Sequence, residues 1–343
     1  MGHGYQAVLW NRQKKRYDLL LMGLVIIYLL VFIIGYSIFD PEATEETLII
    51  RSTGSLAFFL LHVILAIGPL SRLDKRFLPI LYNRRHLGVT MFIIALVHGV
   101  FNILQFHSLS NSNPLVSVFT SNSDYGSLIN FPFQTLGFFA LLILFFMAST
   151  SHDFWLSFLT PKVWKSLHMM VYLAYLLIFF HVALGALQNE QSNMLIVLMS
   201  IGLVGLIYLH LRSSSKEASL DKDKSPLQTG DILVGSIDEI EDTMAKVISI
   251  DGERVAIFRY EGKLSAVSNV CCHQNGPLGE GKIIDGLITC PWHGYQYQPH
   301  DGCAPAPFTE KVATYKLKLE GDQIFLDPKP LPAGTFVEPV KIL

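Results

Sequence analysis

The stretch CCHQNGPLGEGKIIDGLITCPWH, residues 271–293, places two cysteines and two histidines in two short groups. One residue separates Cys271 from His273, and sixteen residues later Cys290 is followed by His293 with two residues between them. Thiolates and imidazoles grouped at such spacings are typical metal ligands. The stretch therefore predicts a metal site that is built from two loops.

The residues around these loops have the pattern of a small all-β domain over 229–343. Short runs rich in β-branched and aromatic residues, such as AKVISI and RVAIFRY, alternate with turn pairs that contain glycine. These pairs are Asp251-Gly252, Glu261-Gly262 and Gly321-Asp322. Because such pairs favour tight turns between neighbouring strands, the metal loops are expected on a scaffold of hairpins.

Two kinds of metal centre use these ligands: a tetrahedral zinc ion and a [2Fe–2S] cluster in which two imidazoles replace two thiolates. The run GPLGEG after the first pair and CPWHGYQY around the second resemble the Rieske [2Fe–2S] family, and the resemblance extends over 229–343. It implies that Cys271, His273, Cys290 and His293 hold the cluster. Zinc is the alternative.

Quinol-oxidising members of that family carry an extra cysteine pair, and a Ser and a Tyr that donate to sulfur. Here Trp292 stands at one of the cysteine positions, Tyr295 at the Ser position and Tyr297 at the Tyr position. Since donors to sulfur raise the reduction potential, the resemblance implies a ferredoxin-like potential, raised somewhat if Tyr297 reaches a ligand. Cys272 and Cys303 are left over, either as packed thiols or as a disulfide.

The chain before this domain is strongly apolar: 51% of all residues are hydrophobic and only 16% are charged, which indicates membrane spans. Six apolar runs approach the roughly 20 residues that cross a bilayer. They lie near 18–39, 52–70, 86–106, 135–150, 166–186 and 194–211. The predicted fold is a membrane α-helical bundle of six transmembrane helices over 1–211, a flexible polar linker over 212–228, and the small all-β Rieske domain over 229–343. No sequence repeat is evident among the spans.

The basic residues between the spans predict the orientation. The segments 1–17, 71–85, 151–165 and 212–228 together hold fifteen Lys and Arg residues, whereas the segments on the other side hold one, Arg51. Because basic loops stay in the cytoplasm, both termini are expected there. The chain is accordingly predicted to be an integral protein of the bacterial inner (plasma) membrane.

Five histidines lie within the predicted spans, where ionisable residues are costly and indicate function. His98 and His181 fall at similar heights on two spans, and His168 lies thirteen residues before His181, or roughly 20 Å along a helix. His86 lies near the height of His168, and His62 lies deeper in the membrane. Two imidazoles at equal height on facing helices are what a b-type haem requires.

A second resemblance is carried by RRHLGVTMFIIALVH, residues 84–98, by LHMMVYLAYLLIFFH, residues 167–181, and by PLSRL before them. They resemble the ferric-reductase-like transmembrane domain, and are most similar to the haem-binding membrane subunit of the periplasmic methionine sulfoxide reductase system. The resemblance implies His98, His168 and His181 as haem ligands for one or two b-type haems. His62 and His86 stand where that family has apolar residues, and either could supply a further ligand.

No Gly-x-Gly-x-x-Gly or Walker-type run follows a predicted strand, so no nucleotide cofactor is expected, and the short basic loops do not suggest nucleic-acid binding. The predicted function is membrane electron transfer between a cytoplasmic Rieske cluster and membrane haem, through redox partner proteins, for a quinone or an extracytoplasmic acceptor. The chain would then be an oxidoreductase component without its own organic-substrate site. Two alternatives are a membrane-anchored Rieske ferredoxin that donates to a cytoplasmic oxygenase, and a terminal ferric reductase.

Overall fold

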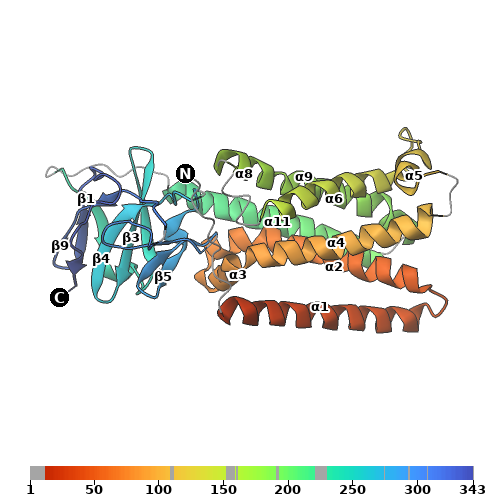
Figure 1. Ribbon diagram of the computed structural model, residues 1–343, viewed down its shortest axis with the longest axis horizontal. Helices are drawn as coiled ribbons and strands as arrows, with labels where there is room; N and C mark the ends of the chain where they lie inside the picture. Colours follow the sequence, from red (N-terminus) through yellow and green to blue (C-terminus); the bar gives the residue numbers. More distant parts are fainter. Residues whose placement is uncertain are drawn as a thin grey trace. The chain divides into compact units, whose positions relative to one another are not determined.

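The computed structural model describes residues 12–108, 112–151, 159, 161–190, 193–220, 230–273, 275–292, 294–306 and 308–342. The chain forms two compact units, drawn in Figure 1. The first combines Met1–Ala66 with Asn83–Tyr208, and the second combines Ile67–Tyr82 with Leu209–Leu343. The β domain therefore shares a unit with the segment 67–82 and with the end of the last long helix.

The described helices are mostly long and apolar. The long ones are α1 (Arg12–Phe39), α2 (Glu45–Leu73), α4 (Arg84–His107), α6 (Phe133–Ser149), α9 (Val171–Leu184) and α11 (Asn193–Leu220). Shorter helices lie between them: η1 (Lys75–Phe77), α3 (Leu78–Tyr82), α5 (Pro114–Thr120), α8 (Pro161–Met169) and α10 (Ala186–Glu190).

Five helical segments are long and apolar enough to cross a membrane, judged by length and composition. They are Lys14–Phe39, Glu45–Leu73, Arg84–His107, Val163–Gln188 and Asn193–Ser219, and α6 is a shorter apolar helix of 17 residues. A helical membrane region followed by an all-β domain is thus confirmed. The fourth predicted span, 135–150, corresponds to α6, which does not reach the length of the other five.

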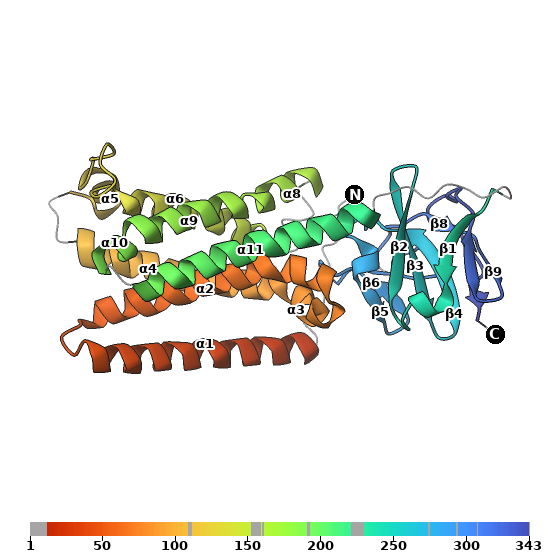
Figure 2. The ribbon, with the colours of Figure 1, turned by 180° about the vertical axis from the view of Figure 1, so that it is seen from behind.

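Within the first unit, α2 is the most buried of the long helices, and α6 and α9 run side by side in both views (Figures 1 and 2). Leu56, Leu60, Leu61 and Ile64 of α2 are buried at helical spacing, so one face of this helix packs against its neighbours. Helix α1 lies at the edge of the bundle (Figure 2). Most of its apolar side chains are exposed, as expected for residues that face lipid.

The predicted linker over 212–228 is shorter than expected, because α11 continues to Leu220. Ser213 is buried in this last part of the helix, and the hydroxyl of Ser215 donates to the carbonyl of Leu211. The segment 212–220 reads RSSSKEASL, in which Arg, Lys, Glu, Ala and Leu are good helix formers. The polar composition of 212–220 therefore does not indicate a flexible linker there. Residues 221–228 lie outside the described residues.

The β domain contains three sheets, with orders β1-β10-β9, β11-β4-β3-β2 and β5-β6-β7, while β8 pairs with β4. The strands are β1 (Ile232–Ser236), β2 (Ala245–Ile250), β3 (Glu253–Tyr260), β4 (Lys263–Ser268), β5 (Lys282–Ile284), β6 (Leu287–Thr289), β7 (Gln296–Tyr297), β8 (Thr314–Tyr315), β9 (Leu317–Glu320), β10 (Gln323–Leu326) and β11 (Val340–Lys341). Short 3-10 helices η2 (Ile237–Glu239) and η3 (Leu278–Glu280) interrupt them.

The predicted turn pairs join neighbouring strands. Asp251 and Gly252 both have positive φ, 49° and 78°, and connect β2 to β3 in a two-residue turn. Glu261-Gly262 also has positive φ at both positions and connects β3 to β4. Asp285-Gly286, which was not among the predicted pairs, makes the same kind of turn between β5 and β6. Because positive φ at both central residues matches the twist of a hairpin, these turns set the strand register.

The β domain has two hydrophobic cores. One is formed by residues of β1, β2, β3, β4 and β10, such as Ile232 and Leu326. The other surrounds the loops before and after β5 and β6, and it includes Cys271, Cys290 and Tyr297. The predicted metal loops are therefore anchored in their own core.

Candidate functional site

The two cysteine-containing loops have the same backbone structure. In the first, the Cys271 N–H donates to the carbonyl of Gly276 and the Asn275 N–H donates to the carbonyl of Cys271, at 2.9 and 2.7 Å. In the second, the same two bonds start from Cys290 and Gly294, at 2.8 and 2.9 Å. The fourth residue after each cysteine, Asn275 and Gly294, has a positive φ of 58° and 73°. Asparagine and glycine tolerate this conformation best, so the two loops present their cysteines alike.

The cysteines face an interior position. Cys271 is fully buried and Cys290 nearly so. A Cβ atom on Gly276 of the first loop would lie 2.7 Å from Sγ of Cys290 in the second, so only glycine permits the two loops to approach this closely. Buried thiols brought together by two loops suit a metal centre that excludes water. This arrangement fits the cluster implied by the sequence.

Tyr297 contacts the first loop directly. Its hydroxyl lies 3.4 Å from Sγ of Cys271 and accepts a hydrogen bond of 3.0 Å from the N–H of Cys272. Burial raises the pKa of Tyr297, and so does negative charge on Cys271, so its phenol keeps its proton. Tyr297 can therefore donate to a ligand sulfur, as the sequence comparison anticipated.

Tyr295 does not take the role of a donor to sulfur. Its ring stacks on the imidazole of His273, with 4.7 Å between ring centroids and an angle of 8° between the planes. Its hydroxyl donates instead to a carboxylate oxygen of Glu310. Tyr295 thus supports a predicted ligand sideways, which the sequence pattern alone did not indicate.

The remaining predictions for this site have different outcomes. Cys272 and Cys303 are free thiols, so the alternative of a disulfide does not hold in this structure, and Sγ of Cys272 donates to the carbonyl of Lys311. His293 lies outside the described residues. Within those residues no three His, Cys, Asp or Glu side chains form a metal-binding group, and the predicted set lacks His293 there.

The membrane region holds a second candidate site, which is formed by His98 of α4 and His181 of α9. Their ring centroids lie 6.2 Å apart. Nδ1–H of His98 donates to the carbonyl of Ile50, and Nδ1–H of His181 donates to the carbonyl of Phe133, both at 2.9 Å. Because a carbonyl can only accept, these bonds place the proton on Nδ1 and leave the lone pair on Nε2 available for a metal.

The spacing of the two rings fits an iron between them. Two metal–nitrogen bonds of about 2 Å each, together with the distance from each nitrogen to its ring centre, add to about 6 Å. The carbonyls of Ile50 and Phe133, which accept from the two histidines, are of the kind that orient metal-bound histidines in proteins. The residues present therefore suit a haem with two axial imidazoles.

Two glycines lie against the imidazoles. A Cβ atom on Gly54 of α2 would lie 2.7 Å from the ring of His98, and one on Gly137 of α6 would lie 2.8 Å from the ring of His181. Each glycine stands four residues after the carbonyl that holds its histidine, and each histidine follows its carbonyl by 48 residues. The two halves of the site are thus built in the same way.

The other candidate histidines have partners of their own. Nδ1 of His168 donates to the carbonyl of Trp164 at 3.1 Å, and the ring stacks on that indole. His62 donates from Nδ1 to the carbonyl of Phe58, and its Nε2 lies 3.0 Å from the Tyr175 hydroxyl. Among the described residues, no ring contact joins His168 to His62.

His86, the second candidate partner of His168, is bound elsewhere. Its Nδ1 lies 2.7 Å from Oδ1 of Asp18 in α1. His107, at the end of α4, is buried with Nδ1 next to the hydroxyl of Ser117 and Nε2 next to Oε1 of Gln134. The structure therefore brings one pair of predicted ligands together, His98 with His181.

Comparisons with known proteins agree with this division. Residues 231–316 match the family described as Rieske [2Fe-2S] domain, and residues 53–179 match the family described as ferric reductase like transmembrane component. The ferredoxin component of the alkene monooxygenase system of Xanthobacter autotrophicus is 28% identical over 100 residues, which are 29% of this chain and 82% of that protein. The ferredoxin component of the naphthalene 1,2-dioxygenase system of Pseudomonas aeruginosa is 30% identical over 81 residues, which are 23% of this chain and 78% of that protein. The biphenyl dioxygenase ferredoxin subunit of a Pseudomonas species is 30% identical over 94 residues, which are 27% of this chain and 86% of that protein.

Proposed function

This chain belongs to the Rieske [2Fe–2S] family, joins its Rieske domain to a ferric-reductase-like transmembrane component, and is a membrane electron-transfer protein; on that basis we propose that it conducts single electrons between a Rieske cluster and b-type haem in the bilayer. The observation that supports the haem is the facing pair of His98 and His181 with both Nδ1 atoms committed to carbonyls.

At the first site, we assign Cys271 and Cys290 to one iron, and His273 and His293 to the other. A bound [2Fe–2S] cluster supplies a centre that gains or loses one electron at a time. The buried thiols keep water from it, and Tyr297 stabilises negative charge on the Cys271 sulfur by its hydrogen bond. One such donor among the described residues supports a potential only modestly above that of ferredoxins with four thiolate ligands.

At the second site, His98 and His181 would hold the haem iron from its two sides, and the haem supplies a second one-electron centre. A haem held by both histidines would have no place for a substrate at its iron, which would suit electron transfer. Gly54 and Gly137 leave the space that the two rings occupy. His168 remains a predicted ligand of a second haem, whose partner would have to come from outside the contacts described above.

The surroundings of the two centres follow from the sequence. We place both termini in the cytoplasm of a bacterial cell and the helices in its inner membrane, because the basic residues favour one side so strongly. A cytoplasmic reductase or ferredoxin would then be one partner, and a quinone or a periplasmic protein the other. The closer similarity to the membrane subunit of the methionine sulfoxide reductase system stays a prediction.

The proposal is tested by a redox titration of the purified chain, followed by optical and EPR spectra together. We expect a Rieske-type EPR signal and a low-spin b-type haem spectrum in one preparation, and loss of the haem spectrum alone in His98→Ala and His181→Ala variants. Zinc in place of non-haem iron, or a pyridine haemochrome assay that detects no haem, would refute the proposed electron transfer between a Rieske cluster and haem.

A second function is favoured by the relatives themselves, which are ferredoxin components of oxygenase systems. In that case the helices would only anchor a ferredoxin that donates to a cytoplasmic oxygenase. The same variants separate the two functions. Electron delivery that is unchanged after both His98 and His181 are replaced would favour the anchored ferredoxin.

A further inference from the structure

The segment 67–82 contacts residues that flank both cluster loops, within the same compact unit. Nε of Arg72, at the end of α2, donates to Oε1 of Glu280 at 2.8 Å, and Glu280 lies in η3, which follows the first loop. The Tyr82 hydroxyl of α3 donates to the carbonyl of Thr289 at 3.2 Å. Thr289 directly precedes Cys290, so one contact reaches each loop.

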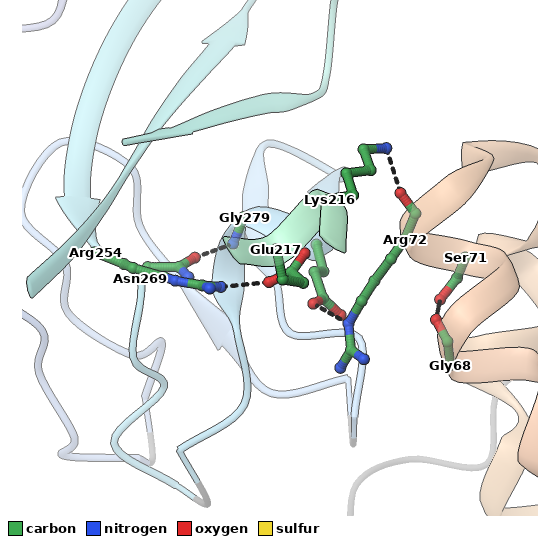
Figure 3. Close-up of polar contacts among 9 residues, drawn as sticks. Gly68, Ser71, Arg72, Lys216, Glu217, Arg254, Asn269 and Gly279 are labelled. Atoms are coloured by element: carbon green, nitrogen blue, oxygen red, sulfur yellow. Dashed lines mark hydrogen bonds and ion pairs between the residues drawn. The ribbon is translucent and has the colours of Figure 1, made fainter. Parts of the chain in front are cut away.

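The end of α11 adds a second set of contacts, which Figure 3 shows beside Arg72. The carboxylate of Glu217 accepts a hydrogen bond of 2.6 Å from the Arg254 guanidinium of β3, and Nζ of Lys216 donates to the backbone carbonyl of Arg72. Asn269, which directly follows β4, holds η3 in place, because its Oδ1 accepts a hydrogen bond of 2.6 Å from the N–H of Gly279. Two arginines and two glutamates thus alternate between the helix ends and the β domain.

These ion pairs are withdrawn from water. The side chains of Arg72 and Glu280 are 34% and 18% exposed, and those of Arg254 and Glu217 are 25% and 21% exposed. Burial raises the pKa of Glu280, and the positive charge of Arg72 opposes that shift. Removing Arg72 would therefore leave a buried carboxylate without its main counter-charge, which costs more than the loss of an exposed pair.

We propose that Arg72 and Tyr82 are positioning residues, which seat the two cluster loops on the segment 67–82 and the end of α11 through ion pairs and a hydrogen bond that can be released. The seat would hold the loops against these helix ends, and its release would free the loops to pass electrons to a soluble partner. This consequence rests on the proposed function, whereas the seat itself does not.

The seat is tested by hydrogen–deuterium exchange of the full chain in lipid nanodiscs, with its metal centres in place. In Arg72→Glu we expect amide exchange in 67–82 and in 276–290 to rise roughly tenfold, because two like charges then face each other. The double variant Arg72→Glu with Glu280→Arg should restore slow exchange in both segments. Sodium chloride at high concentration should accelerate exchange in the wild type at the same two segments, but less than Arg72→Glu does, because partly buried pairs are screened less than exposed ones.

A matched control lies four residues away. Arg76 pairs with Asp74 at 2.6 Å, but its side chain is 88% exposed, and this pair includes no residue of the β domain. Arg76→Glu makes the same charge change and should leave exchange in 276–290 as in the wild type. A Rieske EPR signal in each variant checks that the β domain is folded.

Two results would overturn the proposal. One is an exchange rate in Arg72→Glu equal to that of the wild type, and the other is a double variant that exchanges as fast as Arg72→Glu. If Arg72→Glu loses its EPR signal, Tyr82→Phe and the salt series decide, since neither adds a buried charge, and unchanged exchange in both again overturns it. The exchange readout does not depend on haem. If the double variant restores slow exchange but the chain binds no haem, only the proposed electron transfer to haem is refuted. If the chain binds haem but exchange does not respond to Arg72→Glu, only this inference is refuted.

Discussion

At the scale of single residues, the two sites depend on glycines and hydroxyls as much as on metal ligands. Gly276 allows the cysteine loops to approach, and Gly54 and Gly137 make room for the two membrane imidazoles. Tyr297 adds the hydrogen bond to sulfur. These neighbours decide whether a ligand can reach its working position, so they are where substitutions should be most informative.

Adding a methyl group at either membrane glycine should weaken haem binding. In Gly54→Ala or Gly137→Ala the new Cβ would stand less than 3 Å from an imidazole, and overpacking of this kind costs about 1–3 kcal/mol. We expect a lower haem content per protein, measured by the pyridine haemochrome assay. Gly88→Ala in α4 is the control, because its Cβ would meet no atom within 4 Å. Full haem content in both test variants would contradict the assigned site.

Replacing Tyr297 by Phe should lower the midpoint potential of the cluster. The variant loses one hydrogen bond to the Cys271 sulfur, and a bond worth about 1 kcal/mol corresponds to a shift on the order of 40 mV for one electron. An EPR-monitored titration measures it. Tyr295→Phe should shift the potential less, since its hydroxyl donates to Glu310 and its ring remains stacked on His273. Equal shifts in both variants would contradict the separate roles.

Sequence patterns gave candidate ligands but little indication of the residues around them. The spacing of Cys271, His273 and Cys290 indicated a metal site because metal ligation itself imposes that spacing. Gly54 and Gly137 carried no such signal, because glycines are common in membrane helices and only the packing against a histidine gives these two a role. Tyr295 was predicted by position alone, and position does not reveal that its hydroxyl would find Glu310.

At the scale of secondary-structure elements, α1 is held to the bundle by a few polar contacts. Asp18 bonds to His86, the Tyr28 hydroxyl donates to the Ser55 hydroxyl at 3.1 Å, and the Arg51 guanidinium lies 5.0 Å from the centre of the Tyr36 ring. Only Leu21 and Val25 of its apolar side chains are buried in the described residues. Apolar packing gives little advantage over contact with lipid, so polar contacts can position a membrane helix.

This arrangement predicts different outcomes for two histidines of α4. In His86→Gln we expect full haem content, and a melting temperature a few degrees lower, because a pair of this kind is worth about 1 kcal/mol or less. In His98→Gln the haem absorbance should disappear. Absorbance and thermal melting of both purified variants provide the measurements. Loss of haem in His86→Gln would instead make His86 a ligand, as the sequence also allowed.

Element boundaries were predicted unevenly. Apolar runs located the helices well, because the bilayer sets their length and composition. The end of α11 was missed, since a polar helix that leaves the membrane looks like a linker in composition. The hairpins were predicted well, because an acidic residue followed by glycine, as in Asp251-Gly252 and Glu261-Gly262, favours the positive φ values that a two-residue hairpin turn requires.

At the scale of the whole molecule, the chain divides into two compact units with one candidate redox site in each. The cysteines belong to a core of the β domain, and His98 and His181 belong to the helical unit. The fusion of two families was readable from the sequence, because each part has its own motif. The positions of the side chains that join 67–82 to the β domain were not, because ion pairs between distant segments leave no periodic pattern.

Loss of one centre should leave the other intact. In Cys290→Ser we expect no Rieske EPR signal and an unchanged haem spectrum, because the ligands of the two centres lie in different units. The reverse is expected for His181→Ala. Parallel EPR and optical spectra of the same preparations test this. A haem spectrum that disappears in Cys290→Ser would show that the helical unit needs the cluster in order to assemble.

The matched construction of the histidine pair has a consequence for the ancestry of the membrane region. The corresponding positions of the two halves are all 83 residues apart: Ile50 and Phe133, Gly54 and Gly137, and His98 and His181. Duplication of a two-helix segment would leave this relation between the two halves. The residue types around the two copies differ, while the carbonyl, the glycine and the histidine keep the same spacing.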